Sequence, residues 1–242
     1  MPRMRADRLL VERGLFESRA KARAAIEAGL VSANDAPVRK ASDEIALGAA
    51  LRAESPHPWV SRGGVKLAAA LDHFKFDPKD RVCLDVGAST GGFVEVLLVR
   101  GVRRVYAVDV GRAQLHSRLR QDARVISLEQ TDIRALDPAR LAEAPDLITI
   151  DVSFISLKAV LPAAFALVSP RAKLLALIKP QFEVGRQQVR KGVVRDPALH
   201  AAVCDDIAKF IRSQGWTVID MVASPILGGD GNAEFFIGAT RD

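Results

Sequence analysis

This sequence contains a glycine-rich turn, Asp85-Val86-Gly87-Ala88-Ser89-Thr90-Gly91-Gly92-Phe93, between an apolar strand pattern at 82–86 and a helical pattern at 91–100. Glycine lets a backbone approach a ligand closely and adopt positive φ. Open α/β sheets bind their ligands at the carboxyl ends of the strands, where such a turn lies. The spacing matches neither a dinucleotide fingerprint nor a Walker phosphate loop. The turn predicts a ligand site, although the glycines alone are also compatible with a plain tight turn.

Short apolar segments alternate with helical patterns around this turn. Strands are expected at 82–86, 105–110, 125–128, 147–151, 172–179, 216–223 and 234–239, and helices at 61–74, 91–100, 156–168 and 196–215. Strands that alternate with helices imply a mostly parallel sheet with helices on both faces. We therefore expect the α/β class, with a doubly wound, mostly parallel sheet from residue 61 onward.

The first 55 residues have a different pattern. Helical segments at 7–13 and 19–28 are each followed by a glycine that can end a helix, and Ser18 is a good N-cap for the second. Short β-like pieces follow. Two prolines, at 56 and 58, then suggest a linker. We expect a small α+β domain at 1–55, a linker at 56–60 and the α/β domain at 61–242.

Positive charge is concentrated at the start of the chain. The formal net charge is +6, and residues 1–26 hold seven basic and three acidic side chains. A basic cluster suits a polyanionic partner, and contacts to phosphates fix the register of a nucleic acid. An alternative is that these side chains only solvate the domain. The residues expected to contact RNA are Arg3, Arg5, Arg8, Arg19, Lys21 and Arg23.

Other features bear on the compartment. No run of about 18 apolar residues predicts a membrane span, and the first residues lead into no signal-peptide core. Cys83 and Cys204 lie in apolar segments without metal-ligand spacing. We expect buried free thiols, no metal site, no membrane partner and a cytoplasmic location.

Two further carboxylates extend the predicted ligand site. Asp109 ends the second strand, about 20 residues after the glycines, where an acidic side chain can accept from both hydroxyls of a ribose. Asp132 follows the third strand and can accept from an adenine amino group, or it can cap the helix that begins at Ile133. Adenosine recognition without a phosphate cradle indicates S-adenosylmethionine as the cofactor.

Four charged residues lie near strand ends or beside the first strand. Asp151 and Lys179 end apolar strands, Glu234 opens the last one, and Lys66 lies in the helix before the first. Any one of them alone is compatible with a solvated terminus. Together they suit removal of a proton from a ribose hydroxyl, because crowded lysines in a partly dry site lose protons more readily and Asp151 can orient the amine. The oxygen can then attack the sulfonium methyl group in line.

Longer motifs carry a resemblance to a known family. They read Ser-Arg-Gly-Gly-Val-Lys-Leu at 61–67, the turn at 85–93, Asp-Val-Ser-Phe-Ile-Ser at 151–156 and Ile-Lys-Pro-Gln-Phe-Glu-Val-Gly at 178–185. The chain resembles the TlyA group of ribosomal RNA 2′-O-methyltransferases, often labelled haemolysins. Its larger part is similar to the FtsJ family, and residues 3–54 resemble the RNA-binding fold of ribosomal protein S-four.

The resemblance implies roles for individual residues. It implies ribose methylation of a cytidine in ribosomal RNA or ribosomal subunits by the tetrad Lys66, Asp151, Lys179 and Glu234. One difference is Thr90-Gly91-Gly92-Phe93, where FtsJ-type loops carry Pro-Gly-Gly-Trp. Together, the turn and the resemblance predict these cofactor-binding residues: Asp85, Gly87, Ser89, Gly91, Gly92, Phe93, Asp109 and Asp132.

Two other functions are open at this point: an RNA-binding protein with an inactive methyltransferase fold, and a membrane-active haemolysin. The oligomeric state and the ribosomal subunit are open too. A loop at 183–195, with Arg186, Arg190, Lys191 and Arg195, is either a basic lid that closes on RNA or an ordinary solvated loop.

Overall fold

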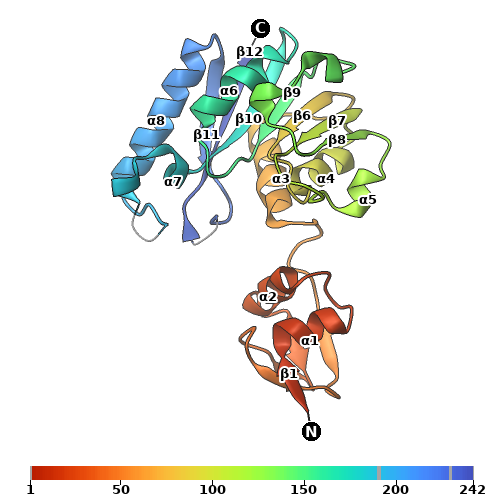
Figure 1. The fold of residues 1–242 in the computed structure, drawn as a ribbon. Coiled ribbons are helices and arrows are strands. Elements are labelled where there is room, and N and C mark those ends of the chain that lie inside the picture. The colour runs from red at the N-terminus through yellow and green to blue at the C-terminus, as the bar shows by residue number, and fades with distance from the viewer. Residues whose placement is uncertain (1, 190–191, 229–230, 242) are drawn as a thin grey trace. The chain divides into compact units, whose positions relative to one another are not determined.

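The chain divides into two compact units, residues 1–58 and 59–242, in a computed structural model that describes residues 2–189, 192–228 and 231–241 (Figure 1). None of the helices in these described ranges is long and apolar enough to cross a membrane.

The first unit combines two short helices with short strands. Its elements are β1 (Arg3–Arg5), α1 (Ala6–Glu12), α2 (Arg19–Glu27), β2 (Val31–Ala33), β3 (Ala36–Pro37), β4 (Glu44–Ala46) and β5 (Leu51–Ala53). β1 pairs with β4, and β2 lies between β3 and β5, all antiparallel. Ser18 caps α2 by accepting from Lys21 N, as predicted. Leu9, Leu10 and Ile26 form the centre of a separate small core.

The second unit contains a seven-stranded sheet. Its strands are β6 (Val82–Val86), β7 (Arg104–Val108), β8 (Val125–Leu128), β9 (Leu147–Ile150), β10 (Ala172–Ile178), β11 (Thr217–Ala223) and β12 (Phe235–Arg241). The order is β11-β12-β10-β9-β6-β7-β8. The strands from β10 to β8 are parallel, and β12 runs antiparallel between β10 and β11. The prediction of a mostly parallel sheet is confirmed.

Helices cover both faces of this sheet (Figure 1). Side chains alternate along β6, so Cys83 packs with α3 (Arg62–Phe74) and α4 (Gly92–Val99), while Leu84 packs with α6 (Leu157–Ala166) and α8 (Pro197–Ser213). Asp196 caps α8 by accepting from Ala198 N. Shorter helical segments are α5 (Ser117–Arg120), α7 (Pro180–Glu183), η1 (Ile133–Ala135), η2 (Pro138–Arg140) and η3 (Arg186–Gln188).

The register of the sheet brings three of the predicted catalytic residues, Asp151, Lys179 and Glu234, to the same end of the strands. Ile178 pairs with Phe235, so Lys179 and Glu234 are the next residues beyond that pair. Val86 pairs with Ile150, so Gly87 and Asp151 stand beyond the neighbouring parallel strands. Since all these positions follow the carboxyl ends of β6, β9 and β10 or precede β12, the fold brings distant segments to one end of the sheet.

Candidate active site and cofactor cavity

Gly87 sits where the turn after β6 touches the backbone after β9. Its φ is +85°, and a Cβ atom there would collide with the carbonyl oxygen of Asp151. The N–H groups of Gly87 and Ala88 both donate to Val108 O, at 2.9 and 3.1 Å. The glycine is therefore needed for a close approach of three strand ends, which is a stronger requirement than a tight turn alone.

Gly91 and Gly92 serve the packing of α4. Gly91 has φ +97° at the N-cap, and a Cβ atom there would collide with Leu119. A Cβ atom on Gly92 would lie 2.9 Å from the backbone nitrogen of Gly64 in α3. Phe93 is buried and stacks on Phe236 at 6.1 Å between ring centroids. These three residues shape the turn from behind.

A cavity of about 430 Å³ opens at the ends of β6, β7 and β9. Of the predicted cofactor residues, Gly87, Ser89, Asp109 and Asp132 line it, and Asp151 lies in the same wall. The rest of the lining is Val86, Val108, Val110, Gln114, Thr131, Ile133, Arg134, Val152, Ser153, Phe154, Ile155 and Val160. Apolar walls with a few carboxylates suit a nucleoside.

The Asp109 carboxylate is held in place by two backbone donors. Its Oδ2 accepts from Ser89 N at 2.8 Å and its Oδ1 from Gly111 N at 2.7 Å. Each carboxylate oxygen has a second lone pair, so both can still accept from a ligand. This arrangement fits the two hydroxyls of a ribose.

Asp132 caps a helix and also lines the cavity. It is the N-cap of η1, since its Oδ1 accepts from Arg134 N at 2.9 Å. The hydrogen bonds from the Arg134 guanidinium hold the pKa of Asp132 below its usual value. The side chain also lines the cavity, so capping does not remove it from the candidate site.

Asp85 lies beneath the cavity, fully buried in β6. Thr149 Oγ1 donates to its Oδ1 at 2.6 Å, and Oδ2 has no hydrogen-bond partner among the residues that the structure describes. Burial, together with the nearby charges of Asp151 and Asp109, raises the pKa of Asp85 to about 7, and the hydrogen bond from Thr149 acts in the opposite direction. Within the described chain Asp85 is not part of the cavity lining.

Lys66 and Glu234 form a buried ion pair, with 2.5 Å between Nζ and Oε2. Gly228 is packed against the same carboxylate, and a Cβ atom there would collide with Glu234 Oε1. The glycine thus lets the segment before β12 pass over the pair. The sequence analysis missed Gly228, because nothing local distinguishes it from a loop glycine.

Lys179 and Asp151 form a second pair at the ends of β10 and β9. Lys179 Nζ lies 2.6 Å from Asp151 Oδ1. The angles at this contact do not fit a hydrogen bond, so we describe it as an ion pair. The amine donates to Ser153 Oγ at 2.8 Å. Ser153, which the sequence analysis did not single out, therefore contacts the Lys179 amine together with Asp151.

Contacts that the sequence analysis did not predict join the segments that follow β9 and β10. Ser156 Oγ donates to Glu183 Oε2 at 2.5 Å, and Leu157 N donates to Glu183 Oε1 at 2.8 Å, so Glu183 caps α6 from a neighbouring segment. Phe154, 92% exposed and with φ +65°, contacts the ring of Phe182 at 5.1 Å. Burial raises the pKa of Glu183.

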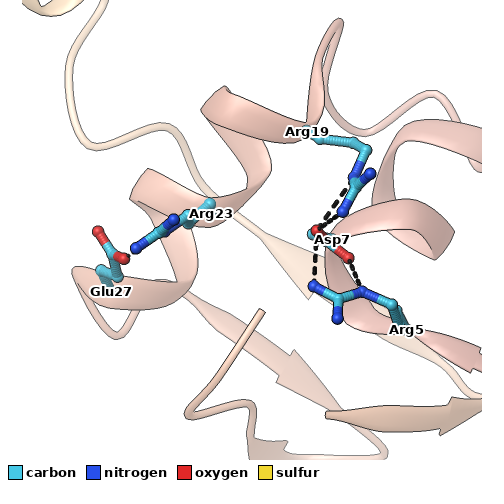
Figure 2. A network of polar contacts seen from close by, with 5 residues as sticks. All are labelled: Arg5, Asp7, Arg19, Arg23 and Glu27. Carbon is cyan, nitrogen blue, oxygen red and sulfur yellow. Dashed lines mark hydrogen bonds and ion pairs between the residues drawn. The ribbon is translucent and has the colours of Figure 1, made fainter. Parts of the chain in front are cut away.

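The basic residues of the first unit have more acidic neighbours than the count of charges in residues 1–26 indicates. Residues 1–58 hold ten basic and eight acidic side chains, a net charge of +2. Asp7 binds both Arg5 and Arg19, and Arg23 pairs with Glu27 (Figure 2). Lys21 pairs with Glu17. More acidic side chains therefore offset this cluster than the seven basic and three acidic residues of 1–26 indicate.

Arg3 and Arg8 differ from the other four. Both are exposed, and neither has an ion pair within the described part of the chain. In the second unit, Arg190 and Lys191 of the predicted basic lid lie outside the described residues. The end of that loop is anchored, since Asn232 accepts from Val194 N at 3.1 Å and donates to Gly192 O at 2.9 Å.

Comparisons with known proteins agree with this architecture. Residues 59–241 match the FtsJ-like methyltransferase family, and residues 4–51 match the S4 domain. A Bacillus subtilis (strain 168) protein named provisionally as the rRNA methyltransferase YqxC is 46% identical, over 96% of this chain and 84% of its own length. The Mycobacterium tuberculosis 16S/23S rRNA (cytidine-2′-O)-methyltransferase TlyA is 45% identical, over 97% of this chain and 89% of its own length.

A solved structure extends the agreement to three dimensions. A Streptococcus thermophilus protein, described provisionally as a hemolysin, is 42% identical with a TM-score of 0.80. The match covers all of this chain and 89% of that one. Because the family match spans most of the chain and includes the strand ends described above, this protein belongs to the FtsJ-like methyltransferase family and carries an S4 domain before its methyltransferase domain.

Proposed function

We propose that this enzyme transfers a methyl group from S-adenosylmethionine to the 2′-hydroxyl of a cytidine in ribosomal RNA. The observation that carries the proposal is that Lys179 pairs with Asp151, which lines a nucleoside-sized cavity. The buried pair of Lys66 and Glu234 lies at the same end of the sheet. The name of the 45% identical TlyA relative supports the substrate class.

The cavity residues fit the adenosine part of the cofactor. Asp109 would accept from both ribose hydroxyls, with Gly87 and Ser89 allowing the chain to approach. Asp132, which also lines the cavity, would accept from the adenine amino group. When bound, S-adenosylmethionine supplies a methyl group on a positively charged sulfur, which an oxygen can attack in line.

Lys179 would remove the proton of the ribose hydroxyl. Asp151 and Ser153 hold its amine at 2.6 and 2.8 Å, so its direction is set before substrate arrives. Lys66, held by Glu234, would bind the hydroxyl oxygen and stabilise the negative charge that develops on it. Most of the catalysis is then positioning and electrostatics.

The S4 domain would hold the RNA. Its exposed arginines can contact phosphates, which gives affinity and register without reading sequence. RNA shape would then supply specificity, with ribosomal RNA in an assembling or mature subunit as the partner. With such a substrate the enzyme would act in the cytoplasm.

A methylation assay tests the activity. Ribose methylation of ribosomal RNA is mapped after incubation with wild type, Lys179→Ala and the control Lys158→Ala, which removes a lysine paired with Asp206 on the surface. We expect one new methylated cytidine with wild type and Lys158→Ala, and none with Lys179→Ala, although it still binds the cofactor. Equal single-turnover rates for all three proteins would refute the role of Lys179, and leakage of liposomes without methylation would favour a haemolysin.

A second experiment tests the division of labour. Residues 59–242 form a compact unit with their own core. We expect this fragment to fold and bind S-adenosylmethionine, yet to lose most RNA affinity and nearly all methylation of subunits. Equal activity and equal salt dependence for the fragment and the full chain would show that the S4 domain does not anchor the RNA.

A further inference from the structure

Asp7 binds two arginines that come from different elements of the first unit (Figure 2). Its Oδ1 accepts from Arg5 Nε at 3.1 Å, and its Oδ2 accepts from Arg5 Nη2 at 3.2 Å. The same Oδ2 accepts from Arg19 Nε at 3.0 Å and Nη2 at 2.6 Å. Both guanidinium groups therefore meet at one carboxylate oxygen.

The Asp7 carboxylate is buried, whereas the Arg5 and Arg19 side chains are exposed. The Asp7 side chain is 6% exposed, whereas Arg5 is 45% and Arg19 61% exposed. A guanidinium carries five N–H donors and each arginine uses two on Asp7, so both have donors left that can face solvent. The carboxylate is hidden beneath two cations that remain open to an anion.

The local structure explains why the arginines converge. Arg5 is the N-cap residue of α1, Asp7 lies in the first turn of that helix, and Arg19 begins α2. The two helices pack on each other and share the small core, which includes Leu10 and Ile26. Asp7 thus removes the rotamer freedom that two long side chains would otherwise lose when a ligand binds.

We propose that Asp7 is a positioning residue for RNA, which holds Arg5 and Arg19 as a preformed clamp for one backbone phosphate. The inference rests on the proposed RNA-binding role of the S4 domain and assigns the clamp within it. Planar guanidinium groups bind phosphate oxygens in pairs of parallel hydrogen bonds, so a fixed orientation matters more here than it would for lysines.

Net charge alone would favour the opposite result for loss of the Asp7 carboxylate. Removing an acidic residue from an RNA-binding surface raises the net positive charge, and this alone strengthens binding. Arg23 and Glu27 provide the matched comparison, because they form an ion pair in α2 of the same unit with both partners largely exposed. Hydrogen bonds from Arg5 and Arg19 lower the pKa of Asp7 to about 2, so the carboxylate is charged at any ordinary assay pH.

The test measures binding of the full-length protein to deproteinised ribosomal RNA over a salt series. We expect Asp7→Asn to weaken binding about tenfold and to reduce the salt slope by about one, as for loss of one phosphate contact. Asp7→Glu should recover part of the affinity. Glu27→Gln, the same loss of charge, should bind as tightly as wild type or more tightly. A folded Asp7→Asn protein that binds as well as Glu27→Gln would overturn the clamp.

A double-mutant cycle on the arginines gives a readout that does not depend on the Asp7 variant. If Arg5 and Arg19 grip one phosphate, the losses from Arg5→Ala and Arg19→Ala are coupled, so the double variant loses less than the two singles combined. Independent, additive losses would overturn the shared clamp. Wild-type protein without RNA affinity would instead refute the proposed function, so the two failures are distinguishable.

Discussion

Lys66 and Glu234 are 168 residues apart in the chain, yet their charged atoms lie 2.5 Å from each other in the interior. Lys66 belongs to α3 and Glu234 immediately precedes β12, so the pair joins the beginning of the methyltransferase domain to its last strand. Both side chains are buried, so each charge is stable in the interior only because the other one neutralises it.

Glu234→Ala should destabilise the methyltransferase domain by about 3–5 kcal/mol, because it leaves the buried Lys66 ammonium without its partner. Replacing both residues, as in Lys66→Met with Glu234→Leu, should recover most of that stability without recovering methyl transfer. Urea unfolding and a methylation assay measure the two effects. A double variant as unstable as the single one would show that the pair is not the cause.

Asp109→Ala should weaken S-adenosylmethionine binding by about 1.5–3 kcal/mol, the range for hydrogen bonds to a charged group. Asp109→Asn should lose less, since its amide oxygen can still accept from Ser89 N or Gly111 N and preserve the turn. Titration calorimetry on folded variants measures both. Unchanged affinity in Asp109→Ala would remove this residue from the cofactor site.

Glu183→Ala should lower kcat for methyl transfer while leaving KM for S-adenosylmethionine nearly unchanged. Glu183 holds the segment after Lys179 against the N-terminus of α6 and lies outside the cavity lining within the described residues. Loss of such a cap should also reduce stability by about 1 kcal/mol. The control Asp206→Asn breaks the nearby surface pair with Lys158 and should leave kcat unchanged. A rise in KM alone would contradict the positioning role.

Asp85 should make stability depend on pH. Its pKa is about 7 in the folded protein and 3.8 for an ordinary aspartate side chain in water, so between these two pH values the folded state keeps a proton that the unfolded state releases. The free energy of unfolding should therefore fall as pH rises through this window, by up to about 4 kcal/mol, and level off above it. Asp85→Asn, which can still accept from Thr149, should abolish this dependence in urea unfolding at pH 5 and pH 8. The same slope in the variant would assign it to other groups.

The strands and long helices could be predicted because each carries a local signal. β6 and β8 begin and end at the predicted residues, since apolar runs of this length are bounded by charged or turn residues. The helices α5 and α7 were missed, because four residues are too few to show a helical period. β1 was missed because Arg3–Arg5 shows no apolar alternation.

Local sequence was sufficient for the fold class, for the glycine turn and for the charged residues at the strand ends, because periodicity, capping and the direction of parallel strands act over short distances. Contacts between distant segments were decided only by the tertiary structure. The pairing of Lys66 with Glu234, the support of Lys179 by Ser153 and the capping of α6 by Glu183 depend on packing across the sheet. The same is true of the acidic partners of Arg5 and Arg19, since which charges meet depends on how α1 and α2 pack and not on how many arginines the sequence contains.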